Sequence, residues 1–335
     1  MTLDSPRNEK GSRNRVIFHG CARKPLLVSV IITTYNRAHL LFRAINSVLN
    51  QTYQNFELII VNGGSSDDTE EVVKAIRDKR IRYCKQTKNK GMLADRNMGF
   101  DLSKGKYITI LDDDDELLPE ALETAINEFS ELSSEGVGIL WFNCMESKNK
   151  ELTGKGKDTD GYVSYEDHLC GKVYGEFWAI IDSDLIGEDA RFDERLWGGE
   201  IIFWLKLHHR TKVFYVHRAL RIYHRECSIV STAENQLKHM SRIVLTEKVF
   251  LEEYGNLRHL CPKKYGQELA ILGFWQILNG EKSEGRETLI NAFKYSRTLK
   301  FHILFLLSFV LNQNQIKSLY LEFLKIGRAR ALAPT

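Results

Sequence analysis

The chain has 335 residues, of which 43% are hydrophobic and 27% charged, a composition typical of globular proteins and too apolar for a disordered one. Its net charge of +3 excludes the strong basic field that drives nonspecific nucleic-acid binding, so no nucleic-acid partner is expected. At roughly 150 residues per domain, the length predicts one large domain and a smaller appendage.

Cysteine spacing and apolar runs bear on the cellular compartment. The six cysteines form no C-x-x-C pair, so reduced thiols in a cytoplasmic protein are expected rather than a zinc ribbon or a redox motif. Residues 1–15 are polar and charged and lack the apolar core of a signal peptide, and residues 1–24 are expected to form a disordered leader. The longest apolar run, 301–311, is shorter than the roughly 20 residues that span a bilayer. We therefore expect a cytoplasmic chain without a membrane span.

Strand and helix patterns alternate through the first third of the chain. Runs of branched apolar residues predict buried strands over 26–32, 56–61, 80–84 and 107–111. Helical spacing predicts helices between them, over 38–50, 69–78 and 93–102. This alternation predicts an α/β fold with a Rossmann-like, doubly wound and mostly parallel sheet. Ligands bind at the carboxyl ends of such strands, so the polar turns that follow them are candidate site elements.

The second half of the chain has a mixed pattern. Strands are expected over 138–142, 177–181 and 213–217, and a helix over 201–209. From residue 233 onward the sequence predicts helices only. We therefore divide the chain into a leader, an α/β domain and an all-helical C-terminal region, with the bounds 1–24, 25–232 and 233–335.

Four consecutive aspartates, Asp112 to Asp115, follow the strand predicted over 107–111. Carboxylates this close repel one another and raise one another's pKa unless a cation or hydrogen-bond donors neutralise them. Such hard oxygen ligands suit Mg²⁺ or Mn²⁺ that bridges a diphosphate. The alternative is a solvated acidic turn in which Asp115 and Glu116 favour the dipole of a helix near Pro119. That alternative explains Asp112 to Asp114 poorly, because they directly follow a buried strand.

Five motifs occur in order over 28–37, 47–52, 56–68, 89–99 and 105–117. Together they resemble the opening of family 2 glycosyltransferases of the GT-A fold, and the resemblance extends over about residues 25 to 230. It implies an inverting glycosyltransferase that binds a nucleotide-diphosphate sugar with Mn²⁺ or Mg²⁺. The sugar would be transferred to a saccharide or lipid-linked acceptor in cell-surface glycan synthesis.

The resemblance also implies a donor site. In the acidic cluster, Asp112 would lie near the ribose and Asp114 would hold the metal, while Asp113 takes the variable middle position. The complete set of nucleotide-sugar-binding residues is then Thr33, Tyr35, Asn36, Arg37, Asn62, Asp67, Arg96, Asp112 and Asp113.

This sequence departs from the family in the turn after the second strand. Asn62 and Gly63 stand where the family often has two acidic residues, although an Asn can still hydrogen-bond the edge of a base. Two donor-site residues have structural alternatives. Asp67 is also placed to cap a helix, and Arg96 to form a salt bridge on a helix surface.

An inverting transfer needs a general base on the acceptor side of the sugar. Aligned on Trp204, Glu200 takes the place of the second acid of the family's acidic pair and Gly199 the place of the first. Glu200 is therefore the predicted catalytic base, with Asp193 and Glu194 as other candidates. The alternative role for Glu200 is a first-turn carboxylate that favours the helix dipole.

His224 and Arg225 lie where the family often has a loop that closes over the diphosphate. The resemblance implies that His224 completes the metal shell and that Arg225 clamps a phosphate. The alternative for His224 is a structural histidine whose hydrogen bonds are satisfied within the fold.

The C-terminal region is basic. From Lys294 onward it has seven Lys or Arg and one acidic residue, Glu322. They flank the apolar run 301–311 and a helix face made by Ile316, Leu319, Tyr320, Phe323 and Leu324. Basic amphipathic helices predict peripheral contact with the cytoplasmic face of an anionic membrane. Packing of these helices on the catalytic domain is the alternative.

Two other functions compete with a transferase. A sugar nucleotidyltransferase usually has a glycine-rich loop after its first strand, but residues 33–37 contain no glycine. A degenerate GT-A protein that binds nucleotide sugar or a partner without turnover stays open, because Gly63 and Gly199 replace residues that are often acidic in the family.

Overall fold

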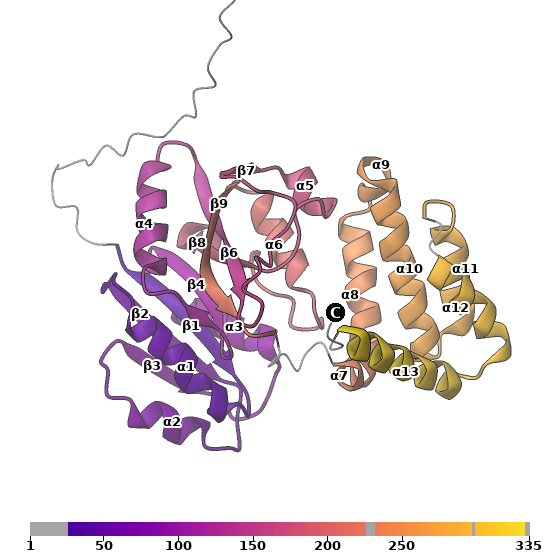
Figure 1. Ribbon diagram of the computed structural model, residues 1–335, viewed down its shortest axis with the longest axis horizontal. Coiled ribbons are helices and arrows are strands. Elements are labelled where there is room, and N and C mark those ends of the chain that lie inside the picture. The colour runs from indigo at the N-terminus through magenta and orange to yellow at the C-terminus, as the bar shows by residue number, and fades with distance from the viewer. Residues whose placement is uncertain (1–25, 226–231, 297–298, 332–335) are drawn as a thin grey trace, which may run out of the picture.

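The computed structural model describes residues 26–225, 232–296 and 299–331, and the predicted leader lies outside them. An α/β domain is followed by a helical region that lies beside it (Figure 1). Within the described ranges, every helix is too short or too polar to cross a membrane. The expected boundary at residue 232 falls between the last strand, β9, and the first C-terminal helix, α7.

A nine-stranded sheet forms the centre of the α/β domain, in the order β3-β2-β1-β4-β8-β6-β9-β5, with β7 paired to β9. Its first half is parallel, as the sequence predicts. This half comprises β1 (Val28–Thr34), β2 (Phe56–Asn62), β3 (Ile81–Lys85) and β4 (Tyr107–Asp112). Consequently the carboxyl ends of β1, β2 and β4 meet at one edge of the sheet.

Helices cover both faces of the sheet. Alternate residues of β1 point to opposite faces and therefore pack into two different hydrophobic cores. Val28, Val30 and Ile32 pack with α1 (Ala38–Leu49), α2 (Thr69–Ala75) and α4 (Ala121–Glu131). Ile31 faces the other way and packs with α3 (Met92–Leu102) and α6 (Glu200–His208). The strand is buried on both faces, which is why its sequence is a continuous apolar run.

The second half of the sheet is mixed. β8 (Phe177–Asp182) runs antiparallel to β4 and to β6 (Val137–Glu146), while β6 is parallel to β9 (Lys212–Tyr223). Two short strands, β5 (Glu116–Leu117) and β7 (Gly161–Val163), pair with β9. β9 extends well beyond the predicted 213–217, and this extension brings residues 221–224 alongside the acidic turn after β4.

The C-terminal region is helical, as predicted. Its first stretch is broken near His239 into α7 (Ala233–Lys238) and α8 (Met240–Glu253). Gly280, at φ +100°, ends α10 in a left-handed conformation that favours glycine. The other helices are α9 (Leu257–Leu260), α10 (Pro262–Asn279), α11 (Lys282–Ala292), α12 (Leu299–Val310) and α13 (Gln313–Ala331).

The helix face expected to meet a membrane, on α13, is largely used for packing. Ile316 is 3% exposed, and the Tyr320 ring lies against Phe274 and Trp275 of α10. Leu319 is exposed, and the side chains of residues 323–324 lie outside the described part. Ile316 and Tyr320 therefore pack within the helical region, and not on the α/β domain that the alternative named.

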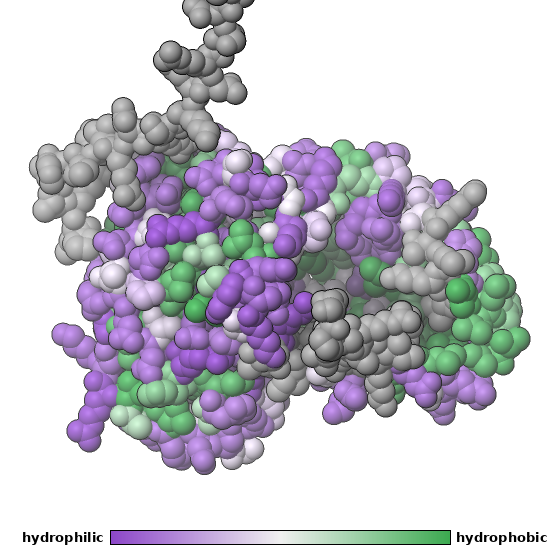
Figure 2. All heavy atoms as spheres, viewed as in Figure 1, coloured by the Kyte–Doolittle hydropathy of each residue, from purple (hydrophilic) through white to green (hydrophobic). Residues whose placement is uncertain are grey.

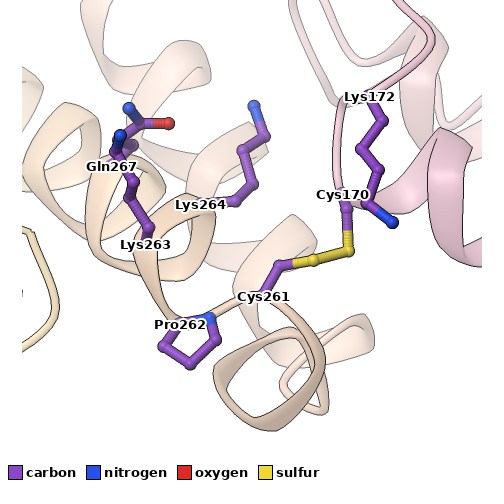
Figure 3. Close-up of a pocket in the computed structure, with 7 residues that line it drawn as sticks. All are labelled: Cys170, Lys172, Cys261, Pro262, Lys263, Lys264 and Gln267. Carbon is purple, nitrogen blue, oxygen red and sulfur yellow. A yellow bond between two sulfur atoms is a disulfide. The ribbon is translucent and has the colours of Figure 1, made fainter.

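A disulfide joins the two regions. Cys170 follows α5 (Tyr165–Leu169) in the α/β domain, and Cys261 precedes α10; their Cα atoms lie 5.8 Å apart (Figure 3). Lys172 and Lys264 line the groove beside this bond (Figure 3). The expectation of reduced thiols is wrong for this pair, because 91 residues of sequence separate them and no local spacing signals the contact. A link of this kind stabilises a fold chiefly by restricting the unfolded chain.

Candidate active site

The acidic cluster lies at the carboxyl edge of the parallel strands. Asp112 is the last residue of β4 and sits in register with Thr33 of β1. Asp113, Asp114 and Asp115 are 4%, 7% and 0% exposed. A solvated acidic turn is therefore the wrong interpretation for these three residues, and their charges need partners within the protein.

Three arginines supply those partners. Arg37, in the turn after β1, lies 2.9 Å from the carboxylate of Asp113 and 2.6 Å from that of Asp114. Arg221 of β9 lies 3.2 Å from Asp112 and 2.7 Å from Asp115. The third, Arg96 of α3, is described below with the predicted base. Guanidinium groups suit this task because they remain charged and donate several hydrogen bonds in one plane.

The carboxylates of the cluster differ in their pKa values. Burial raises the pKa of Asp113 to about 7, although the nearby Arg37 acts to lower it. Burial likewise raises the pKa of Asp115 to about 7, although Arg221 acts to lower it. Burial acts on Asp112 as well, but Arg221 and Arg96 outweigh it and hold its pKa below the ordinary value. Among Asp112, Asp113 and Asp115, Asp112 is thus the carboxylate that stays ionised most firmly.

Arg96 joins the acidic cluster to the predicted base. One guanidinium nitrogen lies 2.8 Å from Asp112, and another lies 3.4 Å from the carboxylate of Glu200. Glu200 is the first residue of α6, where the helix dipole favours a negative charge. Two elements separated by 88 residues of chain, β4 and α6, therefore place their carboxylates on a single cation.

The other acids before α6 have different partners. Asp193 pairs with Arg195 at 2.6 Å, and Glu194 accepts a hydrogen bond of 3.1 Å from the side chain of Asn97. Neither of these contacts reaches the acidic cluster, so Glu200 remains the prediction for the base.

Hydrogen bonds join the turn after β1 to the turn after β2. Asn36 adopts φ +53°, its amide N–H donates to the Ser65 hydroxyl at 2.8 Å, and its side-chain oxygen accepts from the Ser66 amide at 2.8 Å. Asp67 accepts from the amide of Ala38 at the start of α1 and from Thr69 at the start of α2. Asp67 thus binds the first backbone N–H of two helices, which resembles the capping role expected as its alternative, although the N-cap residue of α2 is Asp68. Thr33 is buried in this region, whereas Tyr35 is 44% exposed and faces solvent.

The departure from the family at Gly63 has a physical cause. A Cβ atom there would lie 2.5 Å from the carboxylate of Asp95 on α3, so only glycine leaves room for that carboxylate. Burial raises the pKa of Asp95 to about 6. The side chain of Asn62 accepts from the Ser65 amide and donates to the Tyr83 hydroxyl. Sequence analysis missed Asp95, because nothing local to α3 signals a partner in the turn after β2.

His224 lies beside the acidic turn. Its backbone N–H donates to Asp115 at 2.8 Å, and its ring Nε2 lies 2.8 Å from the carboxylate of Glu116. Two neighbours were not predicted. Arg221 has the contacts given above, and Glu176 places its carboxylate 3.8 Å from Arg221. The basic stretch 221–225 indicated Arg221, because alternate residues of a strand lie on the same face. No sequence pattern indicated Glu176.

A mostly parallel sheet in which β2, β1 and β4 lie side by side and end in two polar turns and an acidic turn places the chain in the GT-A-like class of folds. The crystal structure of Staphylococcus aureus TarS residues 1–349 in complex with UDP-GlcNAc has this fold. It matches with a TM-score of 0.56 and 20% identity, over 82% of this chain and 75% of that one.

The model of glycosyl transferase family 2 matches residues 29–166. An uncharacterized glycosyltransferase of Rickettsia prowazekii is 31% identical over 63% of this chain and 68% of its own length. The GalNAc(5)-diNAcBac-PP-undecaprenol beta-1,3-glucosyltransferase of Campylobacter jejuni is 39% identical over 58% of this chain. That alignment spans 64% of the Campylobacter enzyme. The chain belongs to glycosyl transferase family 2.

Proposed function

We propose that the chain is an inverting hexosyltransferase that moves a sugar from a uridine-diphosphate sugar to a saccharide linked to a polyprenyl diphosphate. The observation that carries this proposal is the bridge by Arg96 between Asp112, at the predicted donor site, and Glu200, the predicted base. The donor class is supported by the UDP-GlcNAc of the TarS complex, and the acceptor class by the undecaprenol named for the Campylobacter enzyme.

The proposed chemistry divides the site between two sides of the sugar. On the acceptor side, Glu200 takes the proton of the attacking hydroxyl as the new bond forms at the anomeric carbon. On the donor side, the bond from that carbon to the diphosphate breaks, and the anomeric configuration inverts. Arg37 and Arg43, the second of which donates to the backbone carbonyl of Asp114, supply positive charge beside the leaving diphosphate.

The residues present fit a divalent cation that is held partly by the substrate. Within the described ranges, three or more His, Cys, Asp or Glu side chains are nowhere grouped to hold a metal alone. Mg²⁺ in such sites is commonly bound by one or two carboxylates together with substrate phosphates. Asp114, with His224 nearby, would hold Mn²⁺ or Mg²⁺ in this way. When bound, the ion would neutralise charge on the leaving diphosphate.

Calorimetric titration tests the donor site. We expect UDP and UDP-sugars to bind the chain more tightly with Mn²⁺ than without it, and Asp114→Asn to weaken binding by about 10- to 100-fold, the loss typical of a contact to a charged group. In Asp114→Asn the dependence on Mn²⁺ should disappear. Asp189→Asn is the matched control, because that carboxylate is 77% exposed and forms its ion pair with Arg210.

Each result has a distinct meaning. Equal binding by the wild type and Asp114→Asn would remove Asp114 and the metal from the donor site. Failure of every nucleotide and nucleotide sugar in a panel of bases to bind would contradict the proposal. Tight donor binding without transfer to any acceptor would instead favour the degenerate, non-catalytic alternative.

A further inference from the structure

Helix α12 leaves a stripe of large apolar side chains in solvent. Ile303, Leu306, Phe309 and Val310 are 49%, 65%, 58% and 76% exposed. Their spacing of three, six and seven residues from Ile303 places them on one side of the helix. Figure 2 shows this stripe as part of a broad hydrophobic surface at the end of the helical region remote from the α/β domain. Contiguous exposed surfaces of this kind mark sites of interaction.

The opposite side of α12 already anchors the helix. Phe301 is 8% exposed and Ser308 is fully buried, and the Ser308 hydroxyl accepts from Arg286 of α11 at 2.9 Å. The fold is therefore complete without the outer stripe, which is free to contact something outside the chain.

The charge around the stripe identifies its occupant. Between Glu287 and Glu322 the sequence has four Lys or Arg and no acidic residue. Lys294 is exposed just beyond the end of α11, and the Arg286 guanidinium lies 4.0 Å from the centre of the exposed Phe309 ring. Glu284 and Glu287 of α11 are exposed as well, but from residue 288 to residue 321 the apolar side chains are accompanied by cations only. This combination matches the interface of an anionic bilayer, where acyl chains lie beneath negative headgroups.

A second copy of the chain fits this surface less well. Two-fold association would place the same basic surface on both sides of the contact, so like charges would face each other. Nor does the surface suit a basic protein partner, for the same reason. The complementary surface is therefore apolar and negatively charged.

We propose that α12 docks the protein on the surface of an anionic membrane, with Ile303, Leu306, Phe309 and Val310 inserted among the lipids. The inference rests in part on the proposed function, because a saccharide linked to a polyprenyl diphosphate is itself held in a membrane. The sequence-based expectation included both the apolar run of α12 and the face of α13, and the proposal places the contact on α12 alone.

Vesicle flotation of the full chain tests the docking independently of catalysis. The protein is mixed with vesicles of phosphatidylcholine alone or with phosphatidylglycerol added, and the bound fraction is measured. We expect binding to the anionic vesicles, weaker binding at high salt, and at least a tenfold loss in the double variant Leu306→Glu/Val310→Glu. Both positions are exposed and Glu is a good helix former, so the variant should fold and bind UDP like the wild type.

Leu260→Glu is the matched control, because Leu260 of α9 is 47% exposed and lies outside the stripe. It should bind vesicles like the wild type. Equal vesicle binding by the double variant would overturn the proposal, as would failure of the wild type to bind. A wild-type dimer that the double variant converts to a monomer, with no vesicle binding, would assign the stripe to a second copy. Because UDP binding is measured in parallel, failure of the docking proposal is distinguishable from failure of the donor site.

Discussion

Glu200→Gln is expected to lower kcat by about 10²- to 10⁴-fold, the usual contribution of a general base, while donor affinity stays within about twofold. The amide oxygen of Gln can still accept the hydrogen bond from Arg96, so the contact between α6 and α3 is kept. What is lost is the ability to take the proton of the acceptor hydroxyl. Steady-state transfer kinetics and calorimetry with UDP on the same preparation separate the two effects.

Glu194→Gln is the matched control for this prediction. Glu194 precedes the same helix, but its carboxylate accepts from Asn97, so its loss should change kcat only slightly. A large fall in kcat for Glu194→Gln with little change for Glu200→Gln would move the base from Glu200 to Glu194. Activity at the wild-type level in both variants would place the base on neither residue.

Arg221→Met is expected to destabilise the fold by about 3–5 kcal/mol, the effect of removing one partner from a buried ion pair. Arg221 is 5% exposed and lies between the carboxylates of Asp112 and Asp115. The fully buried Asp115 would lose the arginine that pairs with it, whereas Asp112 would keep its ion pair with Arg96. The measurement is urea unfolding at neutral pH, followed by intrinsic fluorescence. Because methionine keeps much of the side-chain volume, the loss reports mainly on charge.

Arg218→Met provides the comparison on the same strand. Arg218 pairs with Glu120, but both side chains are more than a third exposed, so its removal should cost no more than about 1 kcal/mol. Adding Asp115→Asn to Arg221→Met should recover part of the lost stability, since one uncompensated charge is removed. Equal unfolding free energies for Arg221→Met and Arg218→Met would contradict the view that Arg221 neutralises the acidic cluster.

Local pattern was sufficient to predict the parallel half of the sheet. The continuous apolar runs marked β1, β2 and β4 because each is buried on both faces, and the acidic motif followed directly from the end of β4. The turns that hold Asn36 and Asp67 were located for the same reason. Their positions depend on where a strand ends, and this is encoded within a few residues.

Contacts between distant segments could not be predicted in this way. Arg221 meets Asp112 across 109 residues, because the long strand β9 runs past the end of β4. Asp95 fills the space left by Gly63, and this requires α3 to lie against the turn after β2. Which side of α12 is exposed depends on which side packs on α11. In each case the periodicity of the sequence predicts the helix or strand, whereas tertiary packing decides which other element it contacts.

Transfer to a lipid-linked acceptor tests the central claim most directly. The full chain would be incubated with Mn²⁺, a panel of radiolabelled nucleotide sugars and saccharides linked to undecaprenyl diphosphate, and the product linkage determined by NMR. We expect transfer from a UDP-sugar, inversion at the anomeric carbon, and loss of product with Glu200→Gln. A product with retained configuration, or no transfer from any donor by a protein that binds UDP, would contradict the account.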